Sequence, residues 1–160
     1  MDQNDVTNLP RNVQIMLGVG LLAFIATFFP FDGIHEHGLG ADENAWNGVA
    51  GVLGALAIML GFVVVVGQTF AAANMPKLGV SWSFITTALG AFATLMFVIH
   101  WIALPSETVF GVHFGLSLQW GGYIEIILCI VFTAVAVMML RESGEAMPWD
   151  SQGAAAPPAA

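Results

Sequence analysis

Four long apolar stretches constrain this chain more than any other feature of its sequence. They cover residues 13–29, 46–66, 80–104 and 121–140, and one acid is the only Asp, Glu, Lys or Arg among them. An α-helix needs about 20 apolar residues to cross a hydrocarbon core of about 30 Å. The run LGALAIMLGFVVVV does not alternate apolar and polar residues, as a transmembrane strand would. We therefore predict an all-α membrane protein, a four-helix antiparallel transmembrane bundle.

The composition excludes a water-soluble globule. Hydrophobic residues make up 58% of the 160 residues and charged residues only 9%, whereas an ordinary soluble domain is about 25% charged. Three basic against eleven acidic residues give a net charge of −8, and binding to nucleic-acid phosphates requires clustered Lys and Arg. A nucleic-acid partner is therefore excluded, and the lipid bilayer is the expected surrounding.

Turn-forming residues separate the apolar stretches. Pro30, Pro76 and Pro105 each follow the end of one of them, and proline commonly marks where a helix stops. The last residues are rich in Ala and Pro and cannot bury enough surface to fold. We predict three regions: a cytoplasmic N-terminal segment over 1–12, a transmembrane domain over 13–140, and a disordered cytoplasmic tail over 141–160.

The basic residues predict the orientation in the membrane. Arg11, Lys77 and Arg141 lie before the first stretch, between the second and third, and after the fourth. All three then fall on one side, which the positive-inside rule makes the cytoplasm. Both termini would be cytoplasmic and the loops over 31–45 and 105–119 would face outward. We expect a multi-pass protein of the plasma membrane. A removed signal peptide is not expected, because the first stretch lacks an A-x-A type cleavage site.

Small residues predict how the helices pack. Lipid tails are as apolar as Leu, so transmembrane helices associate through close backbone approach at Gly and Ala. The fourth stretch has a polar and small face that includes Glu125 and Cys129, and this face should point into the bundle. Cys129 is the one cysteine, so no disulfide forms within the chain. The packing positions we predict are Ala50, Gly54, Ala57, Gly61 and Gly122.

Glu125 is the acid within the four stretches, and an intramembrane carboxylate is costly enough to suggest a function. Counting along each helix at 1.5 Å per residue places Glu125 and His100 within about 6 Å of the same depth. The two side chains can then meet directly or through one water molecule and form an acid–base pair near the outer face. The alternatives are a neutral Glu125 that fixes the register of the last two helices and a carboxylate that reaches toward the interface.

The loop histidines are candidate metal ligands. His35 and His37 flank an acid in DGIHEHG, and His113 lies in FGVHFG. Imidazole and carboxylate suit zinc, iron or nickel, and alternate residues of an extended segment point to the same side. The spacing of a zinc motif is missing. The alternative is an acidic loop that is simply solvated.

No motif indicates catalysis. The sequence has neither a phosphate-binding Gly-Lys-Ser/Thr loop nor a Gly-x-Ser-x-Gly elbow. Paired axial histidines for haem are missing from the spans, where His100 is the only histidine. We therefore expect a protein that is not an enzyme and holds no cofactor.

Three short motifs carry a resemblance to known proteins. FFPF ends the first stretch, NAWNG opens the second after an acidic loop, and LQWGGY opens the fourth. Over most of residues 11–139 the chain resembles small four-span integral membrane proteins of actinobacteria. An aromatic-Pro-aromatic corner, an Asn-Ala-Trp entry, a Gly-rich start of the last helix and an Ala/Pro-rich tail recur in that group. The resemblance implies a four-span topology and a place in the membrane.

Two functional hypotheses follow. The first is a non-enzymatic accessory or interaction subunit of a membrane complex, which has a membrane-protein partner or forms a homo-oligomer. The second is a small ion- or proton-coupled transporter or sensor that uses Glu125 and His100 near the outer face. Four spans are few for a transport path, so the second hypothesis requires a dimer or larger assembly whose interface lines a cavity.

Overall fold

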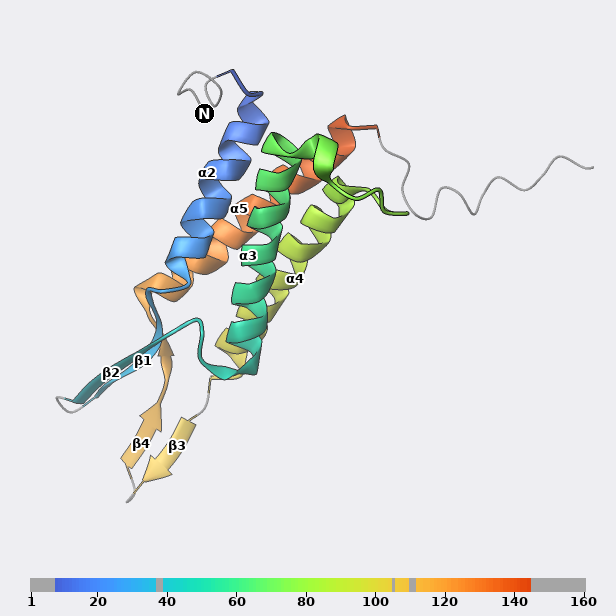
Figure 1. The fold of residues 1–160 in the computed structure, drawn as a ribbon. Helices are drawn as coiled ribbons and strands as arrows, with labels where there is room; N and C mark the ends of the chain where they lie inside the picture. Colours follow the sequence, from blue (N-terminus) through green and yellow to red (C-terminus); the bar gives the residue numbers. More distant parts are fainter. Residues whose placement is uncertain (1–7, 37–38, 105, 110–111, 145–160) are drawn as a thin grey trace, which may run out of the picture.

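Four helices make up most of the structure, a computed structural model that describes residues 8–36, 39–104, 106–109 and 112–144 (Figure 1). They are α2 (Arg11–Ala26), α3 (Gly48–Phe70), α4 (Trp82–Ile102) and α5 (Trp120–Glu142). The last three have 21 to 23 residues and are long and apolar enough to span a membrane. Helix α2 is apolar but has only 16 residues.

The helices pack side by side in a closed ring. Helix α2 contacts α3 and α5, and α4 contacts both of these as well. The start of α2, the α3–α4 connection and the end of α5 lie together (Figure 1). Asn12 Nδ2 donates to Glu142 Oε2 at 2.8 Å across this end. We call it the basic end, because Arg11, Lys77 and Arg141 all belong to these segments.

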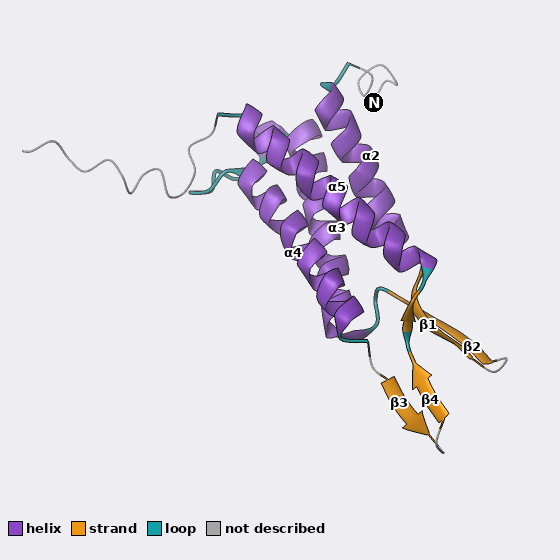
Figure 2. Cartoon of the chain, turned by 180° about the vertical axis from the view of Figure 1, so that it is seen from behind, coloured by secondary structure: helices purple, strands orange, loops and turns teal. Residues whose placement is uncertain are grey.

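The opposite end has β-strands, which the sequence analysis did not predict; we call it the hairpin end. Strands β1 (Pro30–Glu36) and β2 (Leu39–Asn44) form an antiparallel hairpin, and β5 (Ser117–Leu118) pairs with the other edge of β1. Strands β3 (Ser106–Val109) and β4 (Val112–Gly115) form a second hairpin. Both hairpins extend beyond the helix ends (Figure 2).

One phenylalanine fills the centre of the helix ring. Phe132 of α5 is fully buried. A Cβ atom added to Gly20, Gly61 or Gly90 would lie 3.0, 3.3 or 2.9 Å from its ring. Each of these glycines belongs to a different one of the other three helices. The absence of a side chain at all three positions lets the helices close around one aromatic ring.

The small residues predicted at helix contacts are mostly buried. Gly54 faces the Phe97 ring of α4, where an added Cβ would come within 3.0 Å, and Gly61 faces Phe132. Ala57 is buried and Ala50 is half-buried. Gly122 packs against the Phe31 carbonyl oxygen, 2.6 Å from where a Cβ would lie. This last glycine therefore contacts β1 and β5 of the strand layer, our name for strands β1 to β5 at the hairpin end, and not another helix.

The outward helix faces are apolar. Leu22, Val63, Leu95 and Ile127, one from each helix, are each more than half exposed. A helix that is apolar on its inner and outer faces alike is typical of a hydrocarbon environment.

The helix ends differ from the predicted stretches by a few residues. Thr27 follows the last residue of α2, its hydroxyl donating to the Phe24 carbonyl at 2.7 Å. The Asn47 side chain accepts from the Gly48 N–H and so begins α3. At their other ends, α3 and α5 continue to Phe70 and Glu142. Most of the predicted tail, 145–160, lies outside the described residues.

Candidate functional site

A buried acid–base pair joins the strand layer to the helices. His100 Nε2, in the last turn of α4, lies 3.0 Å from Asp32 Oδ2 of strand β1. Asp32 is 2% exposed, and the side chain of His100 is 13% exposed. The second oxygen of Asp32, Oδ1, is buried with no hydrogen-bond partner among the described residues. Removing one partner of such a pair is costly, because the other partner then stays buried without compensation.

Three elements enclose the His100 ring. The Phe31 ring lies 4.9 Å from it and 5.5 Å from the Phe97 ring, measured between centroids. The start of α3 covers the Cε1 edge, where a Cβ on Gly48 would lie only 3.2 Å away. Gly48 has φ +67°, a backbone conformation that favours glycine. The site is thus built from β1, α3 and α4 together.

Two further contacts fix the strands to the helix ends. The indole N–H of Trp46 donates to the Thr27 hydroxyl at 3.0 Å, and the Gln119 backbone N–H donates to the Phe31 carbonyl at 2.8 Å. Gly121 packs so closely that an added Cβ would clash with the Pro30 carbonyl oxygen. Strand β1 therefore lies directly over the start of α5.

Glu125 occupies a separate position in α5. Its side chain is fully buried, and Oε1 accepts a hydrogen bond from Cys129 Sγ at 3.5 Å. The other oxygen, Oε2, has no hydrogen-bond partner in the part of the chain that the structure describes. Glu125 thus faces the interior, as its position on the small-residue face predicted.

Of the alternatives for Glu125, a direct contact with His100 is not present in the structure: His100 contacts Asp32, and Glu125 contacts Cys129. The depth count along α4 and α5 ignored the strand that lies over the start of α5. Asp32 is the site residue that the sequence analysis missed, since it lies in the loop over 31–45, which was expected to face outward. The signal for it was His100 itself: a buried imidazole at a helix end needs a polar partner, and the neighbouring loop is acidic.

The candidate metal ligands belong to different hairpins. His35 pairs with Gly40 in the β1–β2 register, and His113 pairs with Thr108 in the β3–β4 register. His37 lies outside the described residues. Within the described ranges, no three His, Cys, Asp or Glu side chains form a group that could hold a metal ion. The metal site stays a prediction.

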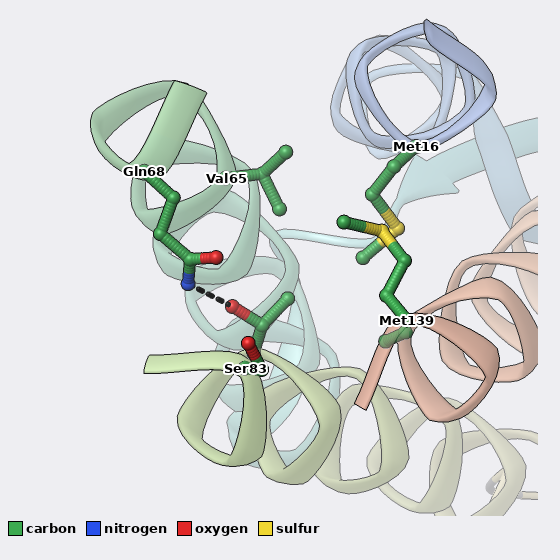
Figure 3. Close-up of a pocket in the computed structure, with 7 residues that line it drawn as sticks. Met16, Val65, Gln68, Ser83 and Met139 are labelled. Carbon is green, nitrogen blue, oxygen red and sulfur yellow. Dashed lines mark hydrogen bonds between the residues drawn. The ribbon is translucent and has the colours of Figure 1, made fainter. Parts of the chain in front are cut away.

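A very small cavity lies between the four helices, near the basic end. It measures about 10 Å³, and Met16, Val65 and Met139 line it from three helices (Figure 3). Beside it, Gln68 Nε2 donates to Thr86 Oγ1 at 3.2 Å and links α3 to α4. A volume of this size holds about one water molecule. It is therefore too small to be a substrate cavity.

No protein-family model, curated protein or solved structure matches the chain. The resemblance to actinobacterial four-span proteins consequently stays a prediction.

Proposed function

We propose that the chain is a multi-pass protein of the plasma membrane, in which the four helices form an antiparallel bundle with both termini in the cytoplasm. Three helices have the length and composition of membrane spans. Helix α2 is about 24 Å long at 1.5 Å per residue, and short helices are accommodated by local thinning of the bilayer. The three basic residues at one end support a cytoplasmic location of that end.

Cysteine labelling in intact cells tests this topology. In a Cys129→Ser background, a cysteine introduced at Ala41 in strand β2 is expected to react with a membrane-impermeant maleimide. A cysteine at Ser143, just after α5, is expected to react only after the cells are permeabilised. The reverse pattern would show that the hairpins face the cytoplasm.

We further propose that the protein is a non-enzymatic accessory or interaction subunit whose strand layer contacts a membrane-protein partner or a second copy. The observation that carries this proposal is that the buried Asp32–His100 pair joins strand β1 to α4, while the hairpins extend beyond the helix ends. In the order β2-β1-β5, strand β2 has one edge that pairs with no other described strand. Such an edge is a ready surface for adding another strand.

Site-specific photo-crosslinking tests the interaction role. Gly115 at the end of β4 and Gly79 near the basic end form a matched pair of positions, because an added Cβ at either meets nothing within 4 Å. A photoreactive residue at Gly115 is expected to give a protein adduct of defined mass in native membranes, and one at Gly79 is not. Lipid adducts alone at both positions, with a monomer as the sole species in mild detergent, would contradict the proposal.

A second candidate, a proton- or ion-coupled transporter or sensor, is favoured by Glu125. Its buried and unpartnered Oε2 is the kind of acceptor that a proton or cation occupies. Because His100 contacts Asp32 and not Glu125, any role of His100 in this transport or sensing function would be exerted through Asp32. Proton or cation flux is measured in proteoliposomes that contain the protein. Loss of this flux in Glu125→Gln would support this candidate. Flux that is unchanged in Glu125→Gln would remove its chemical basis.

A further inference from the structure

The connection between α3 and α4 forms a hollow of about 630 Å³ at the basic end. Its walls come from the end of α3, the short 3₁₀ turn η1 (Ala72–Asn74), and the first residues of α4. The Trp82 indole N–H donates to the Pro76 carbonyl at 3.1 Å. This hydrogen bond ties the connection to the helix start and so shapes the hollow.

The polar part of the hollow is positively charged. Lys77 is the one charged side chain among its described lining residues, and Ser81 and Ser83 contribute hydroxyl groups. Ser81 Oγ accepts the Phe84 N–H at 3.2 Å. The first N–H groups of a helix lack partners within the helix and carry partial positive charge. Lys77, the hydroxyls and the helix start together favour an anion with several acceptor oxygens.

An apolar groove continues from the same segment. It measures about 520 Å³ and shares Leu78 and Val80 with the charged hollow. From there it runs along α4 past Phe84, Ile85 and Ala88, and no charged residue is among its described lining residues. A cationic hollow thus adjoins an apolar groove that leads toward the middle of the helix.

We propose that the charged hollow and the apolar groove together bind an anionic phospholipid of the bilayer leaflet at the basic end. Its phosphate lies against Lys77 and the start of α4, and one acyl chain lies in the groove beside Ala88. Trp82 lies next to the headgroup, at the depth where indole rings gather in membrane proteins. The proposal goes beyond the interaction role and requires no protein partner, only that the basic end lies at the bilayer surface.

Native mass spectrometry of the full chain in mild detergent tests the proposal. The probes are dioleoyl phosphatidylglycerol and dioleoyl phosphatidylcholine, which have the same acyl chains. The parent protein is expected to bind the anionic lipid more tightly. Lys77→Gln is expected to weaken that binding about fivefold, the contribution of one basic side chain near a membrane surface, and to leave phosphatidylcholine binding unchanged.

Two further variants separate this site from general charge attraction. Arg141→Gln removes a positive charge from the same end but outside the hollow, and it should keep the preference for phosphatidylglycerol. Ala88→Phe fills the groove at an exposed position, and it should weaken the binding of both lipids. Equal losses in Lys77→Gln and Arg141→Gln, or no loss in Ala88→Phe, would overturn the proposal. Displacement of the lipid by glycerol phosphate alone at similar concentration would assign the hollow to a free phosphate and overturn the lipid assignment.

Discussion

Replacing Phe132 with alanine is expected to lower the free energy of unfolding by about 3–5 kcal/mol. The ring is fully buried and contacts glycines of the other three helices. Removing the ring leaves a cavity, and the three surrounding glycines have no side chains that could fill it. Reversible denaturation in mixed detergent micelles measures the loss. Phe92→Ala on α4 is the matched control, because this phenylalanine is 41% exposed on the outer face. Equal losses for the two variants would contradict a central role for Phe132.

A coupling measurement tests the same packing from the opposite side. Gly90→Ala places a Cβ 2.9 Å from both the Phe132 ring and Thr133 Oγ1, and overpacking of this kind costs about 1–3 kcal/mol. Gly18→Ala on α2 adds the same group where nothing lies within 4 Å. The cost at Gly90 should shrink when Phe132 is leucine, because the smaller side chain leaves room for the added methyl group. Strict additivity of the two changes would show that ring and glycine do not meet.

The helices could be predicted because lipid-facing and core-facing positions are both apolar. Long uncharged stretches then mark each helix whatever its neighbours are. The glycine at position 61 could also be placed at a contact from its spacing alone. The identity of its partner could not, because spacing says which face packs but not which side chain lies opposite. Phe132 is one of 12 phenylalanines, and nothing in the sequence distinguishes it as the central one.

The strands could not be predicted from local sequence. The segments PFDGIHE and LGADEN contain Pro, Gly, Asp and Asn, all depleted in strands. Their pairing arises from a short reversal of the chain and from the closeness of β1 to the start of α5. Gly121 and Gly122 permit that approach, because a Cβ at either would collide with a carbonyl oxygen of β1. The sequence identified Gly122 as a contact but assigned it to helix packing.

The site residue His100 was predicted, and its partner was not. Counting residues along a helix gives the depth of a side chain in the membrane, so the sequence alone could place His100 near the hairpin end. The direction of its side chain depends on the rotation of α4 and on the path of β1. Asp32 reaches His100 only because β1 crosses the end of the helix array, where Phe31 lies against both Phe97 and His100.

Replacing His100 with alanine is expected to cost about 3–5 kcal/mol of unfolding free energy, because it leaves Asp32 buried without its partner. Asp32 is 2% exposed, and its Oδ2 atom lies 3.0 Å from Nε2 of this imidazole. Ile99→Ala, at a 40% exposed position one residue earlier in α4, is the control and should cost much less. Denaturation in mixed micelles gives the free energies. Hydrogen exchange of the β1 amides should rise in His100→Ala alone, because this pair holds the strand to the helix.

A double-mutant cycle separates the pair from the general cost of changing either residue. Asp32→Ala should also destabilise the protein, but the double variant His100→Ala with Asp32→Ala should lose less than the sum, because no unpartnered carboxylate then remains. Residues in contact couple by about 0.5–3 kcal/mol, whereas independent sites add within about 0.5 kcal/mol. The same cycle with Glu125→Gln in place of Asp32→Ala should be additive. Coupling of His100 to Glu125 and not to Asp32 would restore the pairing that the depth count predicted and would contradict the contact described between β1 and α4.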